Sequence, residues 1–153
     1  TRSLADDSSG DQLQRSLEDA GHRLQERQLC PDDRYQIRRE LSRWIADPAV
    51  DVVITSGGTG LTGRDGTPEA VAPLLDKTIE GFGELFRVLS FESIGTSTLQ
   101  SRCLAGVANG TFVFVLPGSL DAVTTAWNRL IRAQLDADTR PCNLAQLRAR
   151  LKE

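Results

Sequence analysis

The most informative stretch of the chain is residues 52–70, VVITSGGTGLTGRDGTPEA. A run of β-branched residues, typical of a buried strand, leads into a turn rich in glycine and threonine. One acidic residue, Asp65, follows the turn, and Thr67-Pro68 is typical of a helix start. Exposed backbone N–H groups after a buried strand favour a phosphate, and a neighbouring carboxylate favours its magnesium ion. This stretch therefore predicts a phosphate-binding loop.

Three alternatives compete with that interpretation. Residues 58–63 spell the G-x-G-x-x-G pattern of a dinucleotide-binding turn, but Gly66 and Pro68 delay the helix beyond the motif. The same glycines resemble a P-loop, yet Arg64-Asp65 stands where that loop needs Lys-Ser/Thr. A purely structural wide turn would leave an acid after so many exposed amides unexplained.

Helices and buried strands alternate on both sides of this loop. We expect strands at residues 22–29, 50–55, 104–108 and 111–116, and helices over residues 9–21, 31–48, 67–75, 82–89, 119–131 and 143–151. Asn109-Gly110 is a strong turn signal between the last two strands. This order predicts one domain, residues 1–153, folded as a three-layer α/β/α sandwich with a mostly parallel sheet. Ligands of such folds bind beyond the carboxyl ends of the strands.

Composition narrows the possible functions. The 153 residues are 39% hydrophobic and 25% charged, which is ordinary for a globular domain. A net charge of −3 gives no general attraction to nucleic acid, and no apolar run is long enough to span a membrane. The three cysteines form no C-x-x-C pair, and a single histidine excludes a cluster of histidine ligands. We therefore expect a cytoplasmic protein without nucleic-acid or membrane partners.

The longer pattern T-x-G-G-T-G-L-T-x-x-D-x-T-P-E-A resembles the signature of the molybdopterin-binding proteins of molybdenum cofactor biosynthesis. The resemblance is to the branch that contains the B protein and the molybdopterin adenylyltransferases, and it covers nearly the whole chain. It continues through EGFGE (80–84), SFE (90–92), IGTSTL (94–99), SR (101–102), AGVAN (105–109), LPGS (116–119), AW (126–127), QLD (134–136) and TRPCN (139–143).

One feature of the family is not matched. In these proteins a first strand precedes the segment that is residues 6–10 here, DDSSG. The sequence begins at Thr1 and contains no methionine, so we expect that strand to be missing from the sheet.

The resemblance implies nucleotidyl transfer. In that reaction the terminal phosphate of molybdopterin attacks the α-phosphate of ATP, with Mg²⁺, and gives adenylated molybdopterin and pyrophosphate. Asp65 and Asp32 match the functional aspartates of the family, and Asp65 would also bind the metal. The structural alternatives are an Asx turn at Asp65 and helix capping at Asp32, for which Asp33 is equally suited.

Further site residues follow from the same resemblance and from the chemistry of the loops. The amides of Gly57, Gly58, Thr59 and Gly60 are expected to hold a phosphate, Ser101 to contact the pterin, and Pro117, Gly118 and Ser119 to form a second binding loop. Capping of the next helix is the alternative for Ser119, and Arg102 is expected to meet either a phosphate or a surface acid.

The resemblance also implies a homotrimer or homohexamer. Two functions besides the enzyme stay open: a protein that binds and delivers molybdopterin or a precursor without chemistry, and an assembly subunit for other enzymes of the pathway.

Overall fold

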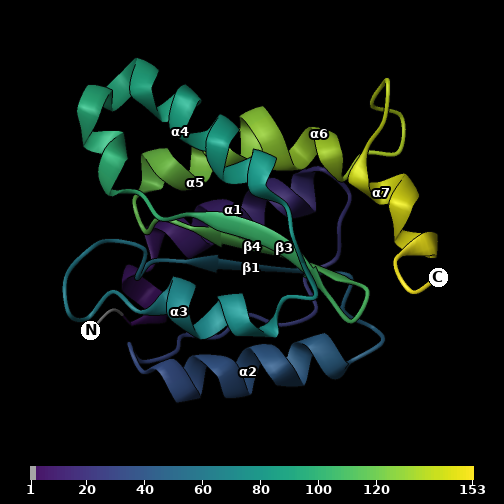
Figure 1. The fold of residues 1–153 in the computed structure, drawn as a ribbon, viewed down its shortest axis with the longest axis horizontal. Helices are drawn as coiled ribbons and strands as arrows, with labels where there is room; N and C mark the ends of the chain where they lie inside the picture. Colours follow the sequence, from purple (N-terminus) through teal and green to yellow (C-terminus); the bar gives the residue numbers. More distant parts are fainter. Residues whose placement is uncertain (1–2) are drawn as a thin grey trace.

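The sheet has four strands in the computed structural model, which describes residues 3–153 (Figure 1). Their order across the sheet is β1 (Val52–Ser56), β4 (Thr111–Leu116), β3 (Leu104–Ala108) and β2 (Lys77–Thr78). Strand β1 runs parallel to β4, with Val52 opposite Phe112 and Ser56 opposite Leu116. The β4–β3 and β3–β2 pairs are antiparallel.

Helices cover both faces of this sheet (Figure 1). One layer contains α1 (Ser8–Asp19), α4 (Glu80–Ile94), α5 (Leu120–Ala126) and α6 (Arg132–Gln134), with a π-helical turn (Trp127–Ile131) between the last two. The other layer contains α2 (Arg34–Ala46) and α3 (Thr67–Val71). Helix α7 (Leu144–Leu147) lies near the C-terminus, and single 3₁₀ segments span Leu4–Asp6, Ala72–Leu74, Gly95–Gln100 and Arg148–Arg150.

Strand β4 forms the centre of both hydrophobic cores, and every one of its residues is buried. Phe112 and Phe114 pack with the α1, α4 and α5 layer, whereas Val113 and Val115 pack with the α2 and α3 layer. Successive side chains of a strand point to opposite faces, so one continuous apolar run serves two cores. This confirms the α/β/α sandwich expected from the sequence.

The sheet is mixed and not mostly parallel, which corrects one detail of that expectation. Asn109 and Gly110 both adopt positive φ angles, of 48° and 77°. Such a pair favours a tight hairpin, so β3 and β4 run antiparallel instead of being linked by a crossover helix. In the part of the chain that the structure describes, β1 and β4 are the single parallel pair.

The strand expected at residues 22–29 does not form. A strand needs a neighbouring strand for its backbone groups, and within residues 3–153 β1 pairs on one side only, with β4. Side chains hold the segment instead: Glu26 bonds to Trp44 of α2 at 2.9 Å, and Arg27 pairs with Asp7 at 2.9 Å. A cavity of about 1,710 Å³ lies between this segment, α1, α2 and β1, and it extends to the loops that follow β1 and β4.

Candidate functional site

The two loops predicted to bind phosphate lie side by side at one end of the sheet. They follow the carboxyl ends of β1 and β4, which are adjacent and parallel, and the Gly57 N–H donates to the Leu116 carbonyl at 2.9 Å. The start of α1 joins them, because the buried Ser9 hydroxyl donates to the Gly118 carbonyl at 2.8 Å. Residues far apart in the sequence therefore line one mouth of the large cavity.

The glycine loop adopts a conformation that needs its first two glycines. Gly57 and Gly58 have φ angles of 107° and 69°, in the left-handed region that other residues avoid. The Gly58 carbonyl accepts from the Thr67 N–H at 3.1 Å, and a Cβ atom on Gly58 would lie 2.3 Å from the Thr67 hydroxyl. The loop thus closes tightly onto the start of α3, where Gly66 is the N-cap and Thr67 is the first helical residue.

Asp65 lies in this loop and its carboxylate folds back on Thr62. The carboxylate accepts from the Thr62 hydroxyl at 2.7 Å and from the Thr62 N–H at 2.9 Å. These bonds, first the hydroxyl and then the N–H, hold the pKa of Asp65 below its ordinary value, so the side chain is ionised at neutral pH. The Asx turn given as the structural alternative for Asp65 does not form, because the Thr67 N–H donates to the Gly58 carbonyl. The bonds back to Thr62 keep an anionic carboxylate at the mouth of the cavity.

Asp32 and Asp33 have separate roles in the structure. Asp33 caps α2, because its carboxylate accepts from the N–H groups of Tyr35 at 3.0 Å and Gln36 at 2.8 Å. Asp32 is not used for capping and pairs with Arg64 at 3.3 Å. The side chains of Asp32 and Arg64 are 50% and 78% exposed, so this contact contributes little stability and its partners can separate. Asp32, Arg64 and Asp65 all line the same cavity.

Ser101 and Arg102 reach the site from the 3₁₀ segment Gly95–Gln100. Ser101 is half-buried and lines the cavity beside the glycine loop. Arg102 pairs with Glu69 of α3, which is the surface-acid outcome foreseen for it, and it also donates to the carbonyls of Gly60 at 2.9 Å and Asp65 at 3.0 Å.

The second predicted loop lines the same cavity with Pro117, Gly118 and Ser119. The Ser119 hydroxyl caps α5, since it accepts from the Ala122 N–H at 3.1 Å. The capping alternative is therefore confirmed for Ser119.

More acidic than basic side chains line this cavity. Asp7, Asp32, Asp65 and Asp121 all line it. Of the nearby bases, Arg27 is held by two carboxylates, those of Asp7 at 2.9 Å and Asp11 at 2.7 Å. An anionic ligand would therefore meet backbone amides and Arg64, and a cation would meet the carboxylates.

Sequence reasoning missed three residues that shape the site: Thr62, Arg64 and Glu69. Thr62 had a local signal, because T-x-x-D is the spacing at which an acidic side chain bonds back to an earlier N–H. The contacts of Arg64 and Glu69 join segments 32 and 33 residues apart, and no local pattern indicates them.

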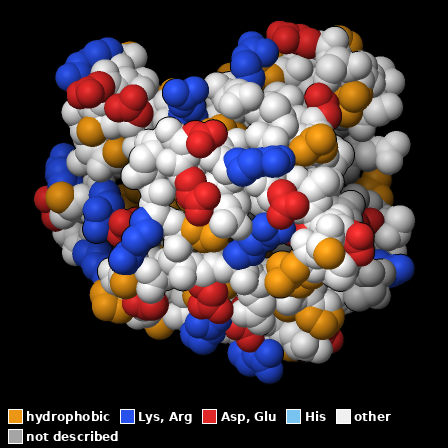
Figure 2. All heavy atoms as spheres, turned by 180° about the vertical axis from the view of Figure 1, so that it is seen from behind, with side chains coloured by type: hydrophobic (Ala, Val, Ile, Leu, Met, Phe, Trp, Pro, Cys, Tyr) orange, Lys and Arg blue, Asp and Glu red, His pale blue; other side chains and the backbone are white. Residues whose placement is uncertain are grey.

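The face seen in Figure 2 mixes basic and acidic side chains, without a stripe of one sign. In the described part of the chain, no three His, Cys, Asp or Glu side chains gather as a metal site. None of the helices between residues 3 and 153 combines the length and the apolar character needed to cross a bilayer.

Fold and site together are those of an α/β protein with a glycine loop at the carboxyl end of a parallel strand, the usual place for an anionic ligand. Comparison with known proteins narrows the class. Residues 2–137 match the family described as "Probable molybdopterin binding domain". The chain belongs to this family of molybdenum cofactor biosynthesis proteins.

Individual relatives agree in sequence and in structure. The chain is 55% identical over 142 residues to molybdenum cofactor biosynthesis protein B of Escherichia coli K12, which covers 93% of this chain and 84% of that protein. A crystal structure of a molybdenum cofactor biosynthesis protein B superposes with a TM-score of 0.85 at 44% identity, over 88% of this chain and 84% of the other. A molybdopterin biosynthesis enzyme of Thermus thermophilus superposes with a TM-score of 0.72 at 31% identity, over 79% of this chain and 76% of the other.

Proposed function

We propose that this protein is a molybdopterin adenylyltransferase. An oxygen of the terminal phosphate of molybdopterin attacks the α-phosphorus of ATP, the bond from that phosphorus to the bridging oxygen of the β-phosphate breaks, and pyrophosphate leaves. The products are adenylated molybdopterin and pyrophosphate. One observation carries the proposal: the glycine loop, Asp65, Asp32 and the second loop, scattered over the sequence, line one mouth of a single cavity.

Phosphoryl chemistry of this kind asks the protein mainly for positioning and charge stabilisation. The amides of Gly58, Thr59 and Gly60 supply donors for phosphate oxygens, whereas the Gly57 N–H is already bonded to the Leu116 carbonyl and shapes the loop. Arg64 supplies an exposed cation. Ser101 and the loop of Pro117, Gly118 and Ser119 are assigned to the pterin side. No side chain needs to form a covalent bond with substrate in this scheme.

The residues present fit a magnesium ion that arrives with ATP. Magnesium binds oxygen ligands and commonly uses one or two carboxylates together with substrate phosphates, so a full protein cage is not required. Asp65 is ionised and lines the mouth of the cavity, and we assign it as the metal ligand, with Asp32 as the second acid. The ion, when bound, neutralises negative charge on the triphosphate.

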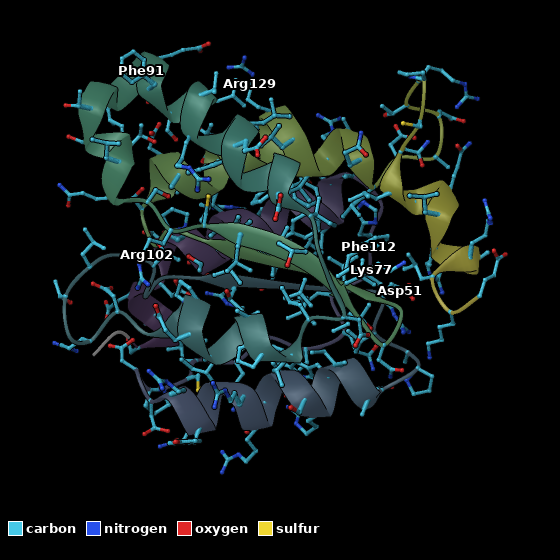
Figure 3. The ribbon with its side chains drawn as sticks, viewed as in Figure 1. Asp51, Lys77, Phe91, Arg102, Phe112 and Arg129 are labelled. Atoms are coloured by element: carbon cyan, nitrogen blue, oxygen red, sulfur yellow. The ribbon has the colours of Figure 1, made fainter. Side chains whose placement is uncertain are left out.

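A homotrimer or homohexamer is part of the proposal, and α4 supports it. Phe82 and Phe86 of α4 point into the core, yet its opposite face is also apolar, with Leu85, Val88 and Phe91 all more than half exposed. Figure 3 shows Phe91 on the outer side of this helix. Exposed apolar side chains gathered along one helix are commonly covered by a partner, and a second copy of the chain is the partner we propose.

The alternative is a protein that binds molybdopterin without chemistry, in the cytoplasm as for the enzyme. The bonds from Thr62 to Asp65 favour it, because they occupy part of the carboxylate that a metal would use. The relatives named above do not separate the two functions.

The test is formation of adenylated molybdopterin with ATP and magnesium, using the wild type beside Asp65→Ala. We expect product from the wild type and none from the variant. Equal rates for the two proteins would contradict the role of Asp65. Absence of product from both, with molybdopterin binding preserved, would establish the binding protein instead.

A further inference from the structure

Arg102 makes three hydrogen bonds to backbone carbonyls of the glycine loop. Its Nε donates to the Gly60 carbonyl at 2.9 Å, and one terminal nitrogen donates to the Asp65 carbonyl at 3.0 Å. Its backbone N–H donates to the Thr59 carbonyl at 3.2 Å. Figure 3 shows Arg102 at the end of the sheet where the loops gather. Arg102, which lies just before β3, is therefore bonded to both ends of the segment 60–65.

Glu69 completes this arrangement from α3. Its carboxylate pairs with the Arg102 guanidinium, and this contact holds the pKa of Glu69 below its ordinary value. The backbone carbonyls of Glu69 and Ala70 accept from Arg38 of α2, at 2.8 Å and 3.0 Å. Arg102 is thus paired with α3, and α3 is itself hydrogen-bonded to α2.

The guanidinium of Arg102 bonds to protein groups, and its planar arrangement of N–H donors allows it to bond to several of them at once. Gly60, Glu69 and Asp65 accept from the Nε, Nη1 and Nη2 atoms of the guanidinium, respectively. A lysine ammonium is a single point with no such planar arrangement, so it could not hold the three acceptors at once. In the loop, Arg102 bonds to backbone carbonyls, so it does not compete with a ligand for the N–H groups of Gly58 and Thr59.

We propose that Arg102 and Glu69 are a positioning pair for the glycine loop. They fix the distance between the Gly60 and Asp65 ends of the loop, and so the place of the loop amides and of the Asp65 side chain relative to bound phosphates. The proposal rests on the proposed function in that the phosphates are those of ATP or molybdopterin. Arg102 acts through the loop and does not itself touch substrate.

The first test is amide hydrogen exchange of residues 57–66 in three variants: Arg102→Lys, Glu69→Gln and the control Arg129→Lys. Arg129 also faces a glutamate, Glu92 at 3.7 Å, but from the helical layer above the sheet (Figure 3). We expect loop exchange to rise about tenfold or more in Arg102→Lys, by less in Glu69→Gln, and not at all in the control. Unchanged loop exchange in Arg102→Lys would overturn the proposal, as would a rise spread over the whole chain. If Arg102→Lys does not fold, Glu69→Gln decides.

The second test is calorimetric titration of the same proteins with magnesium ATP, and with molybdopterin. A displaced loop should weaken ligand binding in Arg102→Lys by about tenfold or more, with little change in melting temperature. Faster loop exchange with unchanged affinity would make the pair merely structural and overturn the positioning role. If the wild type binds neither ligand, the proposed function fails, and hydrogen exchange still decides whether the pair holds the loop.

Discussion

The Asp65 carboxylate accepts both polar hydrogens of Thr62, from the hydroxyl at 2.7 Å and from the N–H at 2.9 Å. These bonds close a turn of four residues, 62–65, in the glycine loop. Arg102 holds the same part of the loop through the carbonyls of Gly60 and Asp65. The acid is therefore both part of the loop framework and the anion that the proposed reaction needs. Substitutions that separate these two roles are the most informative ones.

Asp65→Asn separates charge from shape. The asparagine amide oxygen can still accept from Thr62, so the turn should persist, but the negative charge is lost. We expect the rate of adenylation to fall by about 100-fold or more, because the charge acts on the reacting phosphates, while the melting temperature stays close to that of the wild type. Steady-state kinetics and thermal unfolding of the same preparation check this. Retained activity would show that Asp65 serves the loop alone.

Thr62→Val removes the hydroxyl bond and leaves the N–H bond. The hydroxyl is the foremost cause of the lowered pKa of Asp65, so the variant should raise that pKa towards its ordinary value. NMR titration of the Asp65 carboxyl measures the change directly. A pKa equal to that of the wild type would mean that the hydroxyl bond is absent in solution.

Gly60→Ala tests the space around Asp65, with Gly63→Ala as the matched control in the same loop. A Cβ atom on Gly60 would lie 2.7 Å from an Asp65 carboxylate oxygen, whereas a Cβ atom on Gly63 meets nothing within 4 Å. We expect Gly60→Ala to displace Asp65, to lower stability by about 1–3 kcal/mol and to reduce ligand binding. Gly63→Ala should behave like the wild type in urea unfolding and in titration. Equal behaviour of the two variants would contradict the geometry of the loop.

Patterns over a few neighbouring residues correctly predicted the buried strand β4, the hairpin after β3 and the two loops of the site. The continuous apolar run of β4 is buried on both faces, and Asn109-Gly110 makes the expected hairpin. The two loops after β1 and β4 meet as expected, since parallel neighbours end at the same edge of a sheet. These features depend on residue type and spacing over a few positions, which a sequence displays.

Other features depend on tertiary contacts and could not be predicted. Residues 22–29 were expected to form a strand, but they contain no β-branched residue and no Phe, Tyr or Trp, and a strand forms only against a partner. Asp32 and Asp33 have nearly equal capping propensity, and the α2 entry geometry selects Asp33. The direction of Arg102 follows from where α3 places Glu69, 33 residues away.

The segment 22–30 is held by charges, which makes it sensitive to acid. Arg43 donates to Glu26 at 2.7 Å and 2.9 Å and Trp44 donates at 2.9 Å, and these bonds lower the pKa of Glu26 from 4.5 to about 2. A depressed folded-state pKa contributes stability above pH 4.5 that is lost as the pH falls towards 2.

Glu26→Gln should therefore lower the free energy of unfolding at pH 7, with a smaller effect at pH 3 and almost none near pH 2. Urea unfolding at these three values checks the prediction, with the exposed Glu84→Gln of α4 as control. A loss of stability that is the same at every pH would rule out a contribution from the ionised carboxylate.

Phe91→Glu tests the outer face of α4 as a contact between copies of the chain. Phe91 is 58% exposed, so the substitution should leave the folded subunit intact. Burying a phenylalanine side chain contributes about 1.5–3 kcal/mol, and a charge in its place should weaken association by about 10- to 100-fold or more. Sedimentation velocity of the variant beside Tyr35→Glu, an exposed aromatic on α2 in the opposite layer, measures the effect. We expect trimers or hexamers for the wild type and for Tyr35→Glu, and smaller species for Phe91→Glu. An assembly unchanged by Phe91→Glu would place the contact elsewhere on the surface, and a wild-type monomer at high concentration would remove the oligomer from the proposed function.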